Sequence, residues 1–237
     1  MKYYGLILTT LLTLAACTST EQNREDMPSH LHTQAGEVPT DQLVAARQGN
    51  RLPIVGHHDV TPEGDTIYHT IRDFAFYNQD SVRVTNATYE DKVRVVDFFF
   101  TFCSTICGPI KRKQLELYEE FAGEERLMFL SHTLAPENDD VATLRTYASN
   151  LDLETDRWHL VTGDVEDIYS IHFDYFISAT RDPSARDGIN HGSTIALVDS
   201  QGRVRSVANA LDDAQMARFE QDIRLLLAEE ERLAARD

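Results

Sequence analysis

The sequence predicts an α/β domain with a mixed β-sheet flanked by helices. Strand-like and helix-like segments alternate from residue 93 to residue 173, and two strands joined by a short turn flank this alternation at each end. Such alternation is typical of parallel strands with helical crossovers, and the flanking hairpins add antiparallel strands. The expected strands cover residues 67–76, 81–85, 93–102, 126–134, 158–162, 193–199 and 203–209, and the expected helices cover residues 110–121, 139–151, 165–173 and 212–235.

Each predicted element rests on a local pattern. The first two strands alternate apolar and polar side chains on either side of residues 77–80, as the arms of a hairpin do. Residues 93–102 are almost entirely β-branched or aromatic, which predicts a strand buried on both faces. The segment 212–235 begins with aspartates and carries an apolar stripe at helical spacing. Residues 86–91 predict a short helical or turn connection, and the polar residues 174–188 predict a surface loop.

The N-terminus predicts export and a lipid anchor. Residues 1–16 contain Lys2, an apolar stretch too short to span a bilayer, and small residues before Cys17, which are features of a signal peptide. The sequence Leu-Ala-Ala-Cys resembles the lipobox of bacterial lipoproteins, in which the cysteine becomes the lipidated N-terminus; an ordinary secretory signal is the alternative. The polar residues 17–50 predict a flexible tether. Residues 51–237 are then expected to form one domain with a sizeable core.

Charge and cysteine content exclude several classes of function. The formal net charge of −17 argues against nucleic-acid binding and against electrostatic attraction to anionic lipids. The chain has three cysteines, so only Cys103 and Cys107 remain if Cys17 carries lipid. This pair closes a very small loop and would stabilise the fold little as a disulfide. Reactivity or metal binding is therefore its expected role.

Cys103 and Cys107 follow the buried strand and precede a helical pattern. If residue 104 onward is helical, the spacing places both sulfurs on one helical face, within reach of one ion or of each other. The free N–H groups and the dipole of a helix N-terminus favour the thiolate form. Thiolates select soft metal ions, Cu(I) above all among the common redox metals. The pattern predicts a metal site or a redox dithiol, whereas two inert buried cysteines fit it poorly.

A trigonal copper site needs a third ligand, and the chain has nine histidines. His191 is the best candidate because it follows the polar loop and precedes a strand, which places it at a sheet edge. Parallel pairing of that strand with residues 93–102 would bring His191 near the cysteines, although the sequence does not establish this pairing. His132 falls inside a strand and is expected to be structural. His57 and His58 are expected to lie on the surface, with an accessory ligand pair as the alternative.

These motifs together resemble the SCO/SenC family of membrane-tethered, thioredoxin-like copper proteins, which help to assemble the binuclear copper site of cytochrome c oxidase. The resemblance spans residues 52–227 and rests on Asp97-Phe98-Phe99-Phe100-Thr101-Phe102-Cys103-x-x-x-Cys107, on Trp158-x-x-x-Thr162-Gly163-Asp164, and on His191 before a strand ending Val198-Asp199-x-x-Gly202. It implies that Cys103, Cys107 and His191 bind one copper ion, as Cu(I) or Cu(II). It also implies a thioredoxin-like mixed sheet flanked by helices, with an added N-terminal β-hairpin.

Several positions depart from the family pattern. Gly108 separates the second cysteine from Pro109, Ser104 begins the spacer in place of proline, Ala135-Pro136 stands where Asp-Pro is common, and Asn190 stands where an acid often precedes the histidine. None of these changes removes an expected ligand. We expect the missing acid beside His191 to affect the orientation or basicity of the imidazole, so the preferred oxidation state of copper stays open.

Three functions are compatible with these observations. The expected one is a copper metallochaperone, for which the resemblance implies the copper-site subunit of cytochrome c oxidase as partner, with other copper carriers or thiol reductants beside it. The enzymatic alternative is a thiol-disulfide oxidoreductase acting on the cysteines of a copper-site apoprotein. A thiol peroxidase using Arg112 and Thr101 fits poorly, because a second cysteine lies so close. The expected location is the bacterial cell envelope, where the lipid anchor would hold the domain on the periplasmic face of the membrane.

Overall fold

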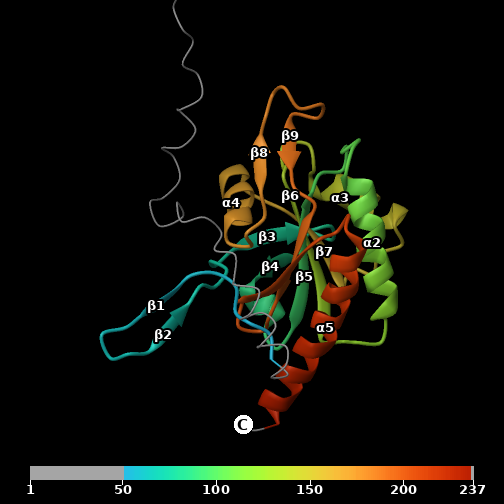
Figure 1. Cartoon of the computed structure of the whole chain (residues 1–237). Helices are drawn as coiled ribbons and strands as arrows, with labels where there is room; N and C mark the ends of the chain where they lie inside the picture. The colour runs from blue at the N-terminus through green and yellow to red at the C-terminus, as the bar shows by residue number, and fades with distance from the viewer. Residues whose placement is uncertain (1–50, 236–237) are drawn as a thin grey trace, which may run out of the picture. The chain divides into compact units, whose positions relative to one another are not determined.

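A seven-stranded mixed sheet forms the centre of the computed structural model, which describes residues 51–235 (Figure 1). The strands lie in the order β11-β10-β5-β6-β7-β3-β4. β5, β6 and β7 are parallel to one another, whereas β10 and β11 at one side and β3 and β4 at the other pair antiparallel. The bounds are Ala75–Asn78 (β3), Arg83–Thr85 (β4), Val93–Phe99 (β5), Leu127–Thr133 (β6), Trp158–Thr162 (β7), Thr194–Val198 (β10) and Val204–Asn209 (β11).

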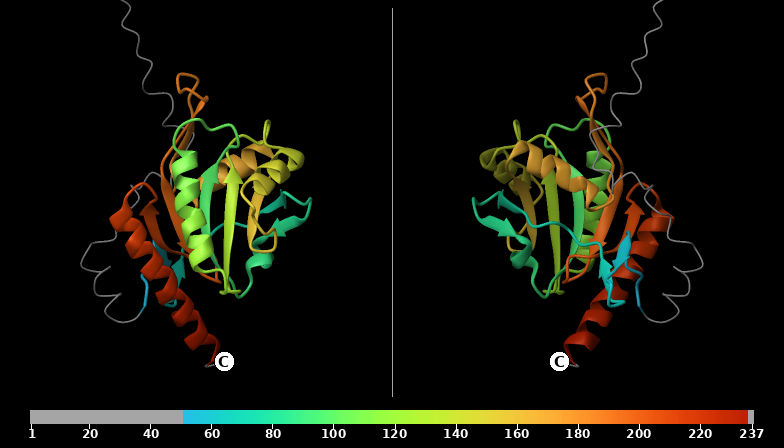
Figure 2. Two further views of the ribbon diagram at one scale, coloured as in Figure 1. Left: turned by 90° about the vertical axis from the view of Figure 1, so that its right-hand side faces the viewer. Right: turned by 90° about the vertical axis from the view of Figure 1, so that its left-hand side faces the viewer.

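Helices cover both faces of this sheet (Figure 2). One face carries α2 (Cys107–Glu120), α3 (Val141–Asn150) and α5 (Asp213–Ala234), and the other carries α4 (Val165–Ser170) and the 3-10 helix η4 (Ile171–Phe173). Lys113 of α2 and Asp213 of α5 form an ion pair of 3.0 Å, which links these two helices side by side. Another short 3-10 helix, η3 (Asn86–Tyr89), follows β4, as the sequence predicts.

Successive side chains of β5 point to opposite faces. Phe99 contacts the ring of Tyr147 in α3, and the ammonium group of Lys111 in α2 lies over its ring. Its neighbour Phe98 contacts the rings of His172 and Tyr175 on the other face. Every residue of β5 is buried, because both faces are covered. This double burial explains why the strand has no apolar/polar alternation in its sequence.

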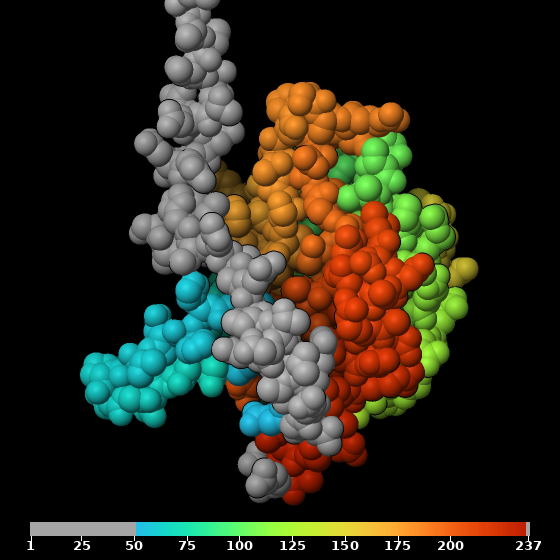
Figure 3. All heavy atoms as spheres, in the orientation of Figure 1, coloured from blue at the N-terminus to red at the C-terminus, as the bar shows by residue number. Residues whose placement is uncertain are grey.

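Two small hairpins lie outside the central sheet. β1 (His58–Val60) pairs with β2 (Thr66–Tyr68), and every residue of both strands is exposed. This hairpin projects from the body of the described residues (Figure 3). The second hairpin pairs β8 (Ala179–Arg181) with β9 (Ile189–His191), so it ends at the predicted histidine ligand.

The structure confirms the predicted mixed sheet and the hairpin at each of its ends, and β7 has the predicted bounds. Residues 67–76 do not form one strand, because Thr66–Tyr68 pairs with β1 and only Ala75–Asn78 pairs with β4. α2 begins at Cys107 rather than at residue 110. The predicted loop at residues 174–188 is wrong in part, because it contains β8.

The signal peptide, the lipid-anchor residue Cys17 and the tether fall in residues 1–50, outside the described residues. These assignments therefore stay predictions. Within residues 51–235, none of the helices combines the length and apolar character needed to cross a bilayer.

A buried ion pair joins α2 to the centre of the sheet. Lys111 Nζ lies 3.0 Å from the Asp97 carboxylate of β5 and donates to Ser131 Oγ of β6 at 3.0 Å. The Ser131 hydroxyl donates to Asp97, and Trp158 Nε1 donates to Ser131 Oγ at 2.9 Å. Burial lowers the pKa of Lys111, and the Asp97 carboxylate opposes that shift. The pair fixes the position of α2, whose first residue is Cys107.

A second buried titratable group, His132 of β6, lies among aromatic rings. It stacks on Phe98 with ring centroids 5.0 Å apart, and its Nε2 lies 3.4 Å from the Tyr175 hydroxyl. Its Nδ1 has no hydrogen-bond partner among the described residues. Burial, aided by the nearby charge of Arg94, lowers the pKa of His132 from 6.5 to about 3. As predicted, this histidine is structural.

Replacing Lys111 with Met should lower the free energy of unfolding by about 3–5 kcal/mol, because the substitution leaves the Asp97 carboxylate buried without its counter-charge. Adding Asp97→Asn to the Lys111→Met chain removes the buried negative charge and should restore part of the lost unfolding free energy. Denaturant unfolding of the full chain measures both effects, with Lys113→Met of the same helix as a partly exposed control. Equal losses in the Lys111 and Lys113 variants would contradict the role of the buried pair.

His132 should make the fold acid-sensitive. Because its pKa is lower in the folded chain, the unfolded chain binds more protons, so stability should fall as pH drops from 6.5 toward about 3. His132→Phe keeps an aromatic ring but has no group that titrates. Within that pH window, the slope of the unfolding free energy against pH should therefore decrease by about 1.4 kcal/mol per pH unit. Urea unfolding at several pH values tests this, and parallel profiles for both proteins would refute it.

Candidate metal centre

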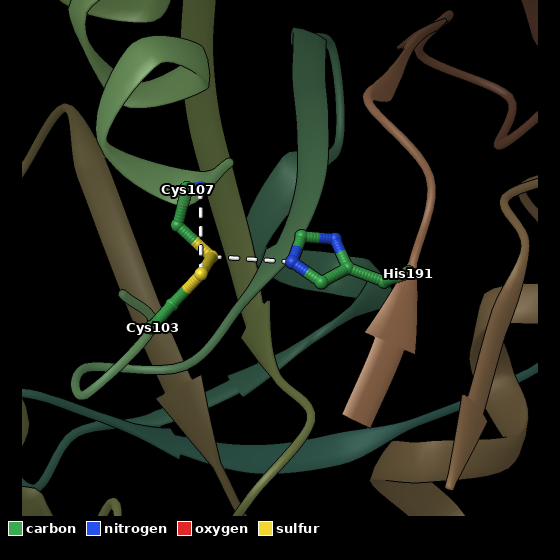
Figure 4. A group of neighbouring side chains, drawn as sticks. All are labelled: Cys103, Cys107 and His191. Atoms are coloured by element: carbon green, nitrogen blue, oxygen red, sulfur yellow. Dashed lines mark hydrogen bonds between the residues drawn. A yellow bond between two sulfur atoms is a disulfide. The ribbon is translucent and has the colours of Figure 1, made fainter. Parts of the chain in front are cut away.

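Two sulfur donors and one nitrogen donor meet at the carboxyl end of β5 (Figure 4). Cys103 lies in the turn after β5, Cys107 is the first residue of α2, and His191 is the last residue of β9. Their ligand atoms all lie within 4.8 Å of one another. Across residues 51–235, no other group of three or more His, Cys, Asp or Glu side chains meets this criterion. The fold thus brings together the three residues that the sequence singled out.

The two cysteines are joined as a disulfide, with their Cα atoms 6.0 Å apart. Cys103 is partly exposed, whereas Cys107 is 4% exposed. The condition for placing both sulfurs on one helical face, a helix from residue 104 onward, is not met, because α2 begins only at Cys107. Cys103 instead precedes the helix, and the Cys107 N–H points at its Sγ at 3.4 Å. In the reduced protein, this N–H would stabilise a Cys103 thiolate.

Hydrogen bonds to Asp139 fix the turn that carries Cys103. The fully buried Asp139 carboxylate accepts hydrogen bonds from Thr101 N at 3.1 Å and from Thr101 Oγ1 at 2.5 Å. Thr133 Oγ1 of β6 donates to the same carboxylate at 2.5 Å. The sequence assigned Asp139 only to the start of a helix. Its contact with Thr101 spans 38 residues, and no local pattern in the chain signals it.

His191 reaches the cysteines through antiparallel strand pairing. β10 follows His191 after Gly192 and Ser193, and it pairs antiparallel with β5, with Ala196 opposite Val96. The parallel pairing considered from the sequence is not observed. In the antiparallel arrangement, the first residues of β10 lie beside the last residues of β5. His191 therefore lies at the sheet end from which Cys103 extends.

Hydrogen bonding and burial prepare His191 to act as a neutral ligand. Its Nδ1 lies 3.0 Å from the Gly192 carbonyl, to which Nδ1–H donates, so the unprotonated Nε2 faces Cys107 Sγ at 3.2 Å. His191 is 8% exposed, and its ring makes an edge contact with the ring of Phe100. Burial lowers the pKa of His191, although the Gly192 carbonyl and the Asp97 carboxylate oppose the shift.

The other candidates from the sequence lie elsewhere or are engaged. His57 and His58 are exposed at the β1–β2 hairpin and belong to no ligand cluster among the described residues. Arg112 is exposed on α2, while Thr101 is held by Asp139. Phe102, next to Cys103, is 45% exposed, so an apolar ring lies at the surface beside the site.

This donor set suits a soft metal ion and also dithiol chemistry. Once reduced, the two cysteines offer thiolate ligands, and His191 offers an imidazole nitrogen that needs no proton release before it binds. Two sulfurs and one nitrogen make three donors, which leaves a further position open. Once oxidised, the same cysteines close the disulfide seen here. The same two sulfurs would therefore serve either as metal ligands in the reduced protein or as the disulfide once an oxidant has removed two electrons.

Comparison with known proteins places the chain in a family. The SCO1/SenC family model matches residues 63–227. A SCO1 protein homolog of Bacillus subtilis (strain 168) is 28% identical over 151 residues, which cover 63% of this chain and 78% of the relative. The solved SCO1/SenC family lipoprotein of Bacillus anthracis str. Ames aligns with a TM-score of 0.60 at 25% identity, over 66% of this chain and 94% of that chain. The solved protein BsSco aligns with a TM-score of 0.59 at 27% identity, over 67% of this chain and 94% of that chain. The fold is thioredoxin-like, and the chain belongs to the SCO1/SenC family.

Proposed function

We propose that the chain is a copper metallochaperone that binds one copper ion through Cys103, Cys107 and His191. The observation that carries the proposal is the convergence of two cysteine sulfurs and one histidine nitrogen within 4.8 Å, at the end of a buried strand. Thiolates favour Cu(I), and the imidazole accepts either Cu(I) or Cu(II). A fourth, open position would suit the additional ligand that Cu(II) prefers.

The three ligands differ in how they would hold and release copper. Cys107 and His191 are buried, so they would hold the ion from the protein side. Cys103 is partly exposed, so it is the ligand that an incoming thiolate or imidazole of a partner can replace first. Transfer would then proceed by stepwise ligand exchange, with the exposed ring of Phe102 available for apolar contact with the partner.

The partner and location follow from the resemblance. BsSco is described as a member of the Sco family of cytochrome c oxidase assembly proteins. By analogy, we propose the copper-site subunit of cytochrome c oxidase as the recipient. The B. anthracis relative is described as a lipoprotein, which supports a lipid anchor at Cys17, a tether over residues 17–50 and a copper-binding domain over residues 51–237. The domain would then face the periplasm from a membrane of the cell envelope.

The disulfide between Cys103 and Cys107 favours a second candidate function. A reduced pair could attack a disulfide of a copper-site apoprotein: one thiolate forms a mixed disulfide, the second displaces the substrate thiol, and this chain ends oxidised. The partner leaves with two reduced thiols, ready for copper. A separate thiol reductant must then restore the pair. This activity uses the same two sulfurs and does not need His191.

Copper titration of the reduced full chain tests the first proposal. Cys17→Ser removes the third thiol, and in this background Cu(I) and Cu(II) should each bind at one equivalent. Cys103→Ser and His191→Ala should each lower the affinity by roughly 100-fold or more, since losing even an outer-shell partner costs 10–100-fold. Competition with a Cu(I) chelator and sulfur-to-copper charge-transfer absorption report the binding. The control is His57→Ala at an exposed histidine, which should change neither the copper affinity nor the charge-transfer absorption.

Two outcomes would contradict the proposed ligand set or the proposed function. Unchanged affinity and spectrum in His191→Ala would remove this residue from the ligand set. Absence of tight copper binding in the reduced chain, together with rapid disulfide exchange on a dithiol substrate, would place the chain among the thiol-disulfide oxidoreductases.

A further inference from the structure

The hairpin that carries His191 has no backbone ladder to the central sheet. β8 and β9 form a two-stranded sheet of their own, with Ala179 opposite His191. At the end of β8 next to the turn, Arg181 forms an ion pair of 2.7 Å with Glu137 and lies over the ring of Tyr169. The position of His191 relative to the cysteines therefore depends on side-chain contacts and on the short link to β10.

One such contact joins the tip of this hairpin to the segment between the two cysteines. The Asp187 carboxylate accepts a hydrogen bond from Ser104 N at 3.0 Å. The Ser104 hydroxyl lies 3.0 Å from each of the two carboxylate oxygens and donates to them. We call this contact the Asp187–Ser104 latch. In Figure 3 the tip of the β8–β9 hairpin and the loop before α2 lie against each other.

The latch connects the two halves of the site through short chain segments. Ser104 directly follows Cys103, and Asp187 lies in the turn between β8 and β9, with only Gly188 between it and the strand that ends at His191. That turn is closed internally, since Asp182 N donates to the Gly188 carbonyl at 2.9 Å and Gly188 N donates to the Ala185 carbonyl at 3.1 Å. Gly188 has φ 75°, which a glycine adopts without strain. Movement of Asp187 away from Ser104 would therefore carry the hairpin with it.

We propose that Asp187 is a positioning residue that holds the β8–β9 hairpin, and with it His191, over the cysteine pair. Hydrogen bonds to an ionised carboxylate are stronger than neutral ones, and here one carboxylate receives both donors of Ser104. Opening the latch would withdraw the imidazole from Cys107 and uncover the buried side of the site. As far as it concerns copper, this inference rests on the proposed function: the latch sets how quickly bound copper is released.

Hydrogen–deuterium exchange of the metal-free, disulfide form tests the latch without any metal. Asp187→Ala should speed exchange several-fold in peptides covering residues 104 and 189–192. The matched control is Asp182→Ala, which removes an acid from the same turn; its carboxylate accepts hydrogen bonds from Ser184 and Ala185, both within that turn. It should leave those peptides unchanged. Ser104→Ala, which loses the hydroxyl and keeps the N–H, should fall between the wild type and Asp187→Ala. Identical exchange in Asp187→Ala and the wild type would overturn the latch.

Copper release provides the second arm of the test. In the Cys17→Ser background, Asp187→Ala should speed transfer of Cu(I) to an excess of chelator by roughly tenfold, as expected for losing charge-assisted hydrogen bonds. Asp182→Ala should match the parent. Looser hairpin exchange with an unchanged release rate would refute the link to copper. If the parent binds no copper, the metallochaperone proposal fails, while the exchange measurement still decides whether the latch exists.

Discussion

Strand polarity at the centre of the sheet is the constraint on which the rest of this molecule depends. β5 runs into the cysteine segment, and β10 runs in the opposite direction beside it, so the chain before β10 must lie where β5 ends. Cysteines and histidine more than 80 residues apart therefore meet at one sheet end without any dedicated cross-link. The carboxyl ends of parallel strands are the usual location of binding sites in such sheets, and this site follows that rule.

The two halves of the site are held with different stiffness. On the cysteine side, Asp139 fixes the turn at Thr101, and the buried pair of Lys111 and Asp97 fixes the helix that begins at Cys107. On the histidine side, a two-stranded hairpin is supported mainly by side chains. This difference suits a carrier: a partner would replace the partly exposed Cys103 first, and the less firmly held hairpin would then let His191 leave the ion.

Local patterns predicted the elements with strong periodicity and failed where pairing is distant. The strand at Trp158–Thr162 and the last helix, capped by Asp212, were predictable from residue type and spacing. β8 and β9 each contain three residues in a polar stretch, too short to show alternation, so this hairpin was missed. Cys103 and Cys107 were identifiable from spacing alone, and His191 from its place before a strand. The antiparallel register that unites them, and the contacts of Asp139 and Asp187, form between segments far apart in the chain, where sequence periodicity carries no information.

X-ray absorption spectroscopy of the Cu(I)-loaded, reduced chain in the Cys17→Ser background tests the central claim most directly, because it counts the donor atoms around the ion. Two sulfur donors and one imidazole nitrogen around a single copper are the result that this account predicts. A shell of sulfur alone, or a copper–copper vector from an ion shared between two chains, would contradict a site built from Cys103, Cys107 and His191 of one chain.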